Sequence, residues 1–206
     1  MKREGFALCA LLETQWPTAP DIDGVVVYSL PKTKMSQGAA LLVAADVTSS
    51  GFESMGDRMM GVTLGEGKER LRVFAFHAPH SGKEETEFSE WWMSAADFVE
   101  KQSIPGVPTI GLGDANATLV SNNIKRTLNQ KQNKGSKHLT AFMLRCGRMV
   151  TPIPAHWREQ LDVCLIRSQW KSSVKDVRSV PPPIPSDHRP LVIKIRVKLK
   201  TRKIAP

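Results

Sequence analysis

The sequence predicts an α/β fold in one domain, and three observations support this prediction. Apolar runs such as residues 6–12, dominated by aliphatic side chains, are typical of strands covered on both faces. In residues 83–102 the apolar positions recur instead at three- and four-residue spacing, which indicates an amphipathic helix packed on a sheet. The chain has 206 residues and no stretch with the composition of a linker, so we expect one domain over residues 1–199 and a basic tail over 200–206.

Five strands are predicted before the first helix, and three strands and one short helix are predicted after it. The first run is expected to be a central strand, and the turn at residues 65–68 indicates a hairpin. Residues 121–137 are rich in Asn, Gln and Lys and are predicted to form a long exposed loop. The predicted strands are residues 6–12, 25–30, 39–45, 59–64, 71–78, 107–112, 161–166 and 191–199, and a short helix is predicted at 139–146.

Two residue types with alternative roles are assigned to the core. Trp91 and Trp92 lie on the apolar face of the helix at 83–102, so we expect core packing rather than stacking on nucleic-acid bases. The cysteines are Cys9, Cys146 and Cys164, an odd number without metal-ligand spacing in apolar surroundings, which predicts buried thiols of an intracellular protein. No apolar run approaches the roughly 20 residues of a membrane helix.

The net charge of +9 is distributed unevenly. Residues 120–206 contain 19 Lys and Arg against 4 Asp and Glu, so residues 1–119 contain the remaining 10 of 29 basic and 16 of 20 acidic residues. The basic residues 120–206 could form a surface that binds a polyanion such as a nucleic acid. Neutralising its phosphates releases counterions, and this release favours binding. A solvated basic face with a loose tail explains the charge equally well.

Several predicted strands end in, or carry, acidic, amide or imidazole side chains. In open α/β sheets such positions border the crevice in which substrates bind. A carboxylate there can hold a hard divalent cation, a second group can deprotonate water, and an imidazole and an amide can stabilise charge on a phosphate. The pattern therefore indicates metal-assisted hydrolysis of a phosphoester. The residues are Glu13, His77, Asp114, Asn116, Asp162, Asp187 and His188.

Each position has a plainer interpretation when taken alone. Asp114 and Asn116 match a common turn sequence, Glu13 can cap a surface loop, and His77 precedes a proline-containing turn. Asp162 is predicted to lie inside an apolar strand, where an unpaired charge costs several kcal/mol. We therefore expect a fixed partner for Asp162, and His188, whose charged form needs a carboxylate, is the candidate.

Five short motifs follow one another along the chain: Leu-Glu-Thr at 12–14, Ala-Pro-His at 78–80, Gly-Asp-x-Asn-Ala at 113–117, Gln-Leu-Asp at 160–162 and Ser-Asp-His-Arg-Pro-Leu at 186–191. In this order they resemble the endonuclease/exonuclease/phosphatase superfamily, and most of all the endonuclease domain of non-LTR retrotransposons or a host protein derived from one. The resemblance extends over residues 6–197. It implies the DNase I-like four-layer α/β/β/α sandwich.

The resemblance also implies a role for each matching residue. Glu13 is expected to ligate Mg²⁺ or Mn²⁺, with Asp187 assisting at the metal side. Asp114 is expected to orient or deprotonate the attacking water, and Asn116 to position the water and the phosphate. Asp162 is expected to pair with His188, which contacts the scissile phosphate.

The sequence departs from the family pattern at two places. The nuclease branch usually carries Tyr at the position of His77, where an imidazole can still donate to a phosphate. The family also begins with a strand whose Asn helps to bind metal and phosphate, and the sequence starts just before the second motif. We therefore expect a domain truncated at its N-terminus, with an exposed sheet edge or with a further polypeptide segment that supplies the strand.

The predicted function is divalent-metal-dependent endonucleolytic hydrolysis of DNA phosphodiester bonds that leaves a 3′-hydroxyl. One alternative is a nucleic-acid-binding remnant that has lost the chemistry, and another is a phosphoesterase for small phosphoesters. The expected location is intracellular, with the nucleus as one option. The residues expected to contact DNA are Lys125, Arg126, Lys131, Lys134, Arg158 and Arg189.

Overall fold

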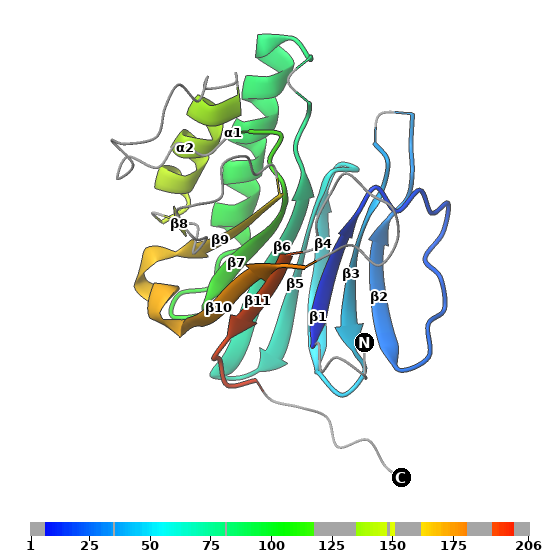
Figure 1. Cartoon of the computed structure of the whole chain (residues 1–206), viewed down its shortest axis with the longest axis vertical. Coiled ribbons are helices and arrows are strands. Elements are labelled where there is room, and N and C mark those ends of the chain that lie inside the picture. Colours follow the sequence, from blue (N-terminus) through cyan, green and yellow to red (C-terminus); the bar gives the residue numbers. More distant parts are fainter. Residues whose placement is uncertain are drawn as a thin grey trace.

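The protein consists of a helical layer, a six-stranded sheet and a second layer of strands, as Figure 1 shows. This computed structural model describes residues 7–34, 36–80, 82–117, 135–147, 149–150, 162–180 and 191–199. The helices are α1 (Glu85–Gln102), α2 (Gly135–Arg145) and the 3-10 helix η1 (Ser168–Ser173). The strands are β1 (Leu8–Leu12), β2 (Val25–Leu30), β3 (Ala39–Ala44), β4 (Ser49–Met55), β5 (Met59–Glu66), β6 (Glu69–His77), β7 (Thr109–Asp114), β8 (Met149–Val150), β9 (Asp162–Arg167), β10 (Val174–Ser179) and β11 (Leu191–Ile195).

The six-stranded sheet has the order β4-β5-β6-β7-β9-β8. Strands β5 and β6 form the predicted antiparallel hairpin, in which Glu66 pairs with Glu69 across the turn. Strands β6 and β7 are parallel, because the chain returns through α1 before it enters β7. As a result the carboxyl ends of β6 and β7 meet at the same edge of the sheet.

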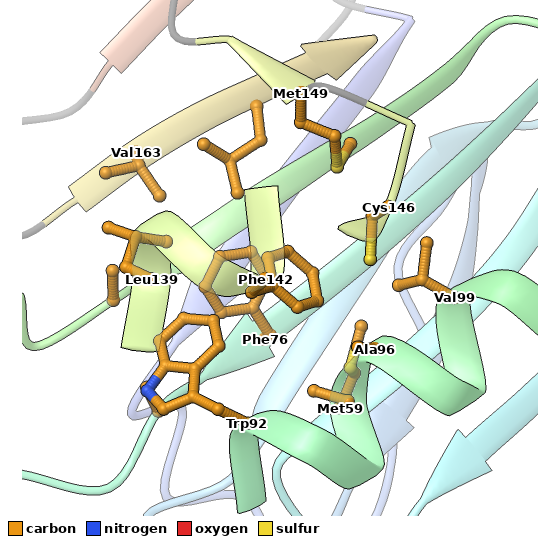
Figure 2. Close-up of a cluster of buried hydrophobic side chains, with 14 of the residues drawn as sticks. Met59, Phe76, Trp92, Ala96, Val99, Leu139, Phe142, Cys146, Met149 and Val163 are labelled. Carbon is orange, nitrogen blue, oxygen red and sulfur yellow. The ribbon is translucent and has the colours of Figure 1, made fainter. Parts of the chain in front are cut away.

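Helices α1 and α2 cover one face of this sheet, and the predicted amphipathic helix is confirmed. Their apolar side chains form one core with those of the sheet, including Phe76, Trp92, Phe142 and Val163 (Figure 2). Trp92 is 3% exposed and Trp91 packs against the same cluster, which confirms the assignment of both tryptophans to the core. Helix α2 begins at residue 135 rather than 139, so the predicted exposed loop ends in helix.

The opposite face of the sheet carries two smaller antiparallel sheets, β1-β3-β2 and β10-β11. Their apolar side chains pack on a second core around Val62, Val73 and Ile166. The predicted α/β fold of the DNase I-like class is confirmed, and the described residues build its helix, sheet and sheet layers. Both described α-helices, α1 and α2, belong to the same layer.

The prediction of a central first strand is wrong for the described part of the chain. Strand β1 pairs only with β3 and is the outer strand of its sheet, and all five of its residues are half-buried. An apolar run indicates contact with a core, which β1 makes through Leu8, Ala10 and Leu12. Local composition carries no information about which strand lies next to which.

Strand β4 was not predicted, because its sequence Ser-Ser-Gly-Phe-Glu-Ser-Met is mostly polar and exposed. Its position depends partly on Arg72 of β6, a guanidinium only 2% exposed. Nη1 of Arg72 donates to the Gly51 carbonyl at 2.8 Å and to the Thr63 hydroxyl at 3.1 Å. A buried cation on β6, two strands away, thus helps to hold a polar strand that periodicity does not reveal.

All three cysteines are free thiols. Cys146 and Cys164 are buried as predicted, whereas Cys9 on β1 is half-buried. No helix in the described ranges has the length and hydropathy needed to cross a membrane.

Candidate functional site

Three predicted site residues form a row across adjacent strands. His77 ends β6 and pairs in register with Asp114, which ends β7. Asp114 in turn pairs in register with Asp162, which begins β9 rather than lying inside it. In-register neighbours project on the same face of a sheet. The row therefore continues the face of Ala75, Ile110 and Ile166, which packs toward the smaller sheets.

Glu13 approaches this row from the second layer. It follows β1, and its Oε1 lies 3.7 Å from Nε2 of His77. The same Nε2 atom lies 3.9 Å from Oδ2 of Asp114. The Asp114 side chain is 7% exposed and that of Glu13 is 53% exposed, so one carboxylate is buried and the other is open to solvent. An imidazole thus lies between two carboxylates that come from different sheets.

Asn116 connects the ends of β6 and β7. Its backbone N–H donates to Oδ1 of Asp114 at 2.7 Å, and its side-chain Nδ2 donates to the Ala78 carbonyl at 2.8 Å. The Ala78 N–H also donates to the Asp114 carbonyl at 2.9 Å. These bonds hold the Asp114 carboxylate and the segment after His77 in one fixed arrangement.

Backbone strain concentrates at this site. Among the described residues other than glycine, a positive φ occurs at Glu13 (54°), Gln15 (54°) and Asn116 (45°). Left-handed backbone is costly for residues with a Cβ, least so for Asn, and it often occurs at functional sites. Two of the three are residues that the sequence assigned to the site.

Sequence reasoning missed three residues near this site. Gln15, two residues after Glu13, accepts a hydrogen bond from the exposed Nζ of Lys32 at 3.2 Å. The backbone carbonyl of Arg58 accepts a hydrogen bond from the His77 N–H at 2.8 Å. Nη1 of Arg58 donates to the His77 carbonyl at 3.5 Å. No motif marks these positions, because they reach the site through strand pairing and a loop.

The donor groups fit a hydrated Mg²⁺ ion. Mg²⁺ keeps several waters and is typically held by one or two carboxylates together with substrate phosphates. Glu13 and Asp114 each place a carboxylate oxygen within 3.9 Å of Nε2 of His77, and the exposure of Glu13 leaves room for water. Within the described ranges no three His, Cys, Asp or Glu side chains form a complete metal cage. A Mg²⁺ ion held by these carboxylates would therefore need waters and substrate phosphate for most of its ligands.

The remaining predicted site residues lie outside the described residues. They include the second expected metal ligand, the imidazole expected to pair with Asp162 and the basic residues expected to contact DNA. Their roles stay predictions. These residues are Asp187, His188, Lys125, Arg126, Lys131, Lys134, Arg158 and Arg189.

Three solved structures with a similar fold are endonucleases. The endonuclease domain of TRAS1, a telomere-specific non-LTR retrotransposon, superposes with a TM-score of 0.68, covering 95% of this chain and 88% of that domain. The fold is that of the DNase I-like endonucleases. The AP endonuclease LMAP from Leishmania major gives a TM-score of 0.73 over 95% of this chain and 80% of that one. An AP endonuclease from Archaeoglobus fulgidus gives 0.66 over 94% and 90%, and sequence identity is 15% in all three cases.

Two proteins with a similar sequence are much longer than this chain. Craniofacial development protein 2 from Bos taurus is 24% identical over 225 residues, and its counterpart from Tragulus javanicus is 25% identical. The alignments cover 97% of this chain but only 38% and 39% of those proteins, so the chain spans less than two fifths of their length. No protein-family model matches the sequence.

Proposed function

We propose that the protein is a divalent-metal-dependent endonuclease that hydrolyses DNA phosphodiester bonds. The observation that carries this proposal is the convergence of Glu13, His77 and Asp114 from two different sheets, with Nε2 of His77 within 3.9 Å of both carboxylates. Acid, imidazole and a hydrogen-bonded turn at the ends of neighbouring strands suit phosphoester hydrolysis. Fold alone does not imply function, so the proposal depends on this site.

Each side chain has a distinct proposed role. The exposed Glu13 carboxylate holds Mg²⁺ or Mn²⁺, which when bound neutralises phosphate charge and polarises the P–O bond. The buried Asp114 carboxylate, oriented by the Asn116 N–H, accepts a proton from the attacking water. His77 donates a hydrogen bond to a phosphate oxygen as charge develops there.

The proposed reaction is an in-line displacement at phosphorus. A bond forms between the water oxygen and phosphorus as the bond from phosphorus to the 3′-oxygen breaks. The water proton passes to Asp114, and the departing 3′-oxygen takes a proton from solvent and becomes a 3′-hydroxyl. The products are a 3′-hydroxyl end and a 5′-phosphate end.

DNA is the proposed substrate because two independent observations favour a polyanion. The solved structures of similar fold include AP endonucleases and a retrotransposon endonuclease domain. The net charge is +9, and the excess of basic residues lies in residues 120–206. Such a charge distribution favours association with phosphates. Because the proposed substrate is DNA, we propose that the protein is located in the nucleus.

The test is nicking of supercoiled plasmid by the purified protein with Mg²⁺ or Mn²⁺, compared with Asp114→Asn. Asparagine keeps an oxygen that accepts the Asn116 N–H but loses the charge and the base, so the variant is expected to fold and to lose nicking. Equal nicking by both proteins would refute the assigned role of Asp114. Absence of nicking by the parent protein would refute the endonuclease proposal.

The basic C-terminal half also supports a second candidate, which is binding of nucleic acid without hydrolysis. This candidate predicts DNA binding that weakens steeply between about 50 and 200 mM salt, with no metal-dependent turnover. Binding that does not change over this salt range would exclude phosphate contacts as its basis.

A further inference from the structure

Strands β10 and β11, together with the adjoining 3-10 helix η1, carry an exposed basic surface. Residues 168–179 and 191–199 contain six Lys and Arg and one acidic residue, Asp176, so their net charge is six minus one, or +5. We call these two segments the basic ribbon. Its basic side chains are all exposed, and they are Lys171, Lys175, Arg178, Lys194, Arg196 and Lys198.

The two faces of the basic ribbon differ in chemistry. The inner face packs on the second core through Val174 and Ile195, which are register partners. From residue 193 to residue 199 the side chains alternate between half-buried and exposed, which is the period of an extended strand. The outer face is therefore cationic. Its exposed positions in this segment are Lys194, Arg196 and Lys198.

Much of this charge lies at the end of the sheet opposite the candidate site. Asp162 begins β9 beside Asp114, and β9 then leads away from the site to η1. The Arg196 N–H donates to the Ser173 carbonyl at 2.7 Å, which places Arg196 beside the last residue of η1. Figure 1 shows β11 running in the direction opposite to β1, the strand that leads to Glu13. A ligand held around Arg196 would therefore lie away from the candidate site.

Little of the positive charge on the basic ribbon is neutralised by neighbours. In the described ranges, one ion pair lies on the ribbon, and it joins Nη1 of Arg178 to Oδ2 of Asp176 at 3.7 Å. Nζ of Lys175 donates to the Ser172 carbonyl at 2.7 Å, which is a neutral partner. Helix α1, on the other side of the six-stranded sheet, instead carries five acidic residues and one Lys. This contrast favours the approach of a polyanion toward the ribbon rather than toward α1.

The arrangement of the cations suits the phosphate backbone of a nucleic acid. Alternate residues of an extended strand lie about 6.6 Å apart on one face. This spacing is comparable to the separation of neighbouring phosphates along one strand of DNA. Contacts of Lys and Arg with phosphates release counterions and give affinity that does not depend on sequence.

The other side chains of the basic ribbon favour a duplex over other polyanionic partners. The large apolar side chains that are exposed in the described structure are Phe52, Met93 and Leu144, which lie outside the ribbon. The ribbon therefore lacks the apolar centre of a typical protein interface. Stacking on unpaired bases needs exposed rings, whereas Trp170 of η1 is half-buried against the second core.

We propose that the basic ribbon binds the phosphate backbone of duplex DNA at a surface separate from the candidate site. Lys194, Arg196 and Lys198 contact successive phosphates, and Lys171 and Lys175 flank them. Because this surface lies away from the candidate site, the protein can hold one DNA segment here while another segment occupies that site. Binding at the ribbon does not require that the protein hydrolyses DNA.

The first test maps the surface on the parent protein. Lysine side chains of the full chain are acetylated briefly in EDTA, with and without a short duplex, and the modified positions are quantified by mass spectrometry. We expect the duplex to slow acetylation of Lys194 and Lys198 several-fold and to leave Lys101 of α1 unchanged. Equal rates at Lys194 and Lys198 with and without the duplex would overturn the proposal.

The second test removes charge from the basic ribbon. The double variant Lys194→Gln, Arg196→Gln is compared with Lys101→Gln, Arg145→Gln, which removes one Lys and one Arg from exposed positions of the helical layer. Fluorescence anisotropy of a labelled duplex in EDTA gives Kd between about 50 and 200 mM salt.

We expect the ribbon variant to bind the duplex at least about tenfold more weakly and to lower the slope of log affinity against log salt by about 2. The control variant should bind like the parent. Similar Kd values and slopes for the two variants would show that the ribbon is only a solvated face and would overturn the proposal. The acetylation test needs no variant, so it decides the matter even if a substitution affects folding.

The third test distinguishes duplex DNA from other anions. The acetylation experiment is repeated with poly-glutamate and with phosphatidylserine vesicles at the same total charge as the duplex. We expect the duplex to protect Lys194 and Lys198 most strongly. Equal protection by poly-glutamate or by the vesicles would indicate a general anion surface and would overturn the assignment to DNA. None of these measurements reads nicking, so failure of the endonuclease proposal would be seen separately.

Discussion

His77 and Asp114 are register partners across the parallel pair β6–β7, and Nε2 of His77 lies 3.9 Å from Oδ2 of Asp114. The sheet register itself therefore brings the imidazole beside the carboxylate. Glu13, which comes from the other layer, completes the group at 3.7 Å from the same nitrogen. The position of His77 makes it the first residue to test.

His77→Ala is expected to lower the rate of plasmid nicking by about 100-fold, because a hydrogen-bond donor for developing phosphate charge is lost. His77→Tyr restores a donor of larger size and is expected to recover part of the rate. The measurement is the initial nicking rate at saturating Mg²⁺, with Tm recorded for each variant because His77 is buried. Equal rates for His77→Ala and the parent would contradict a role in the reaction.

Asn116→Asp is expected to destabilise the protein by about 1–3 kcal/mol, because the new carboxylate cannot donate to the Ala78 carbonyl. Thermal unfolding should show this as a fall in Tm of roughly 2–4 °C per kcal/mol. Asn116→Gly is the control, since glycine adopts the φ of 45° freely and removes the same hydrogen bond without adding charge. A Tm for Asn116→Asp equal to that of the parent would show that the bond contributes nothing to stability.

Glu13→Gln is expected to weaken Mn²⁺ binding at least about tenfold, because a carboxylate ligand is replaced by an amide. Electron paramagnetic resonance of free Mn²⁺ measures this without reference to activity. Glu69→Gln makes the same charge change at the opposite end of β6 and should bind Mn²⁺ like the parent. Similar affinities for Glu13→Gln and Glu69→Gln would exclude Glu13 as a ligand. Chelation with EDTA should abolish nicking by the parent.

The contact between α1 and α2 should depend on pH through Glu85. Hydrogen bonds from Lys137 and then His138, whose Nε2 lies 3.0 Å away, lower the pKa of Glu85 from its ordinary 4.5 to about 2. A carboxyl pKa that is lowered in the folded state stabilises the protein above the ordinary pKa and loses this effect as the pH falls. Glu85→Gln should therefore lower Tm slightly at pH 7, and the difference should shrink between about pH 4.5 and 2.

The effect of Glu85 should remain small and sensitive to salt, because its side chain is exposed to solvent. Glu90→Gln, at another exposed position of α1, is the control for net charge. A Tm difference between Glu85→Gln and the parent that stays constant from pH 7 to the acid range would contradict the assignment.

Much of the fold was accessible from local patterns. The three- and four-residue spacing around Phe88 and Trp92 predicted α1 and its buried face, and Gly65 and Gly67 marked the β5–β6 turn. The polar β4 could not be predicted, because its stability depends on pairing and on the buried Arg72. The position of β1 at a sheet edge was mispredicted, since composition reports burial but not strand order.

By itself, the sequence determined that Glu13, His77, Asp114 and Asn116 stand at strand boundaries, because apolar runs and their polar ends are local properties of the chain. Only the tertiary structure decided that Glu13 meets His77, because that contact joins the two strand layers. It also decided the left-handed backbone at Glu13, Gln15 and Asn116 and, among the described residues, the position of β1 and β11 as outer strands of their sheets. Register, packing between layers and backbone strain arise from contacts between residues far apart in the chain, which no local pattern encodes.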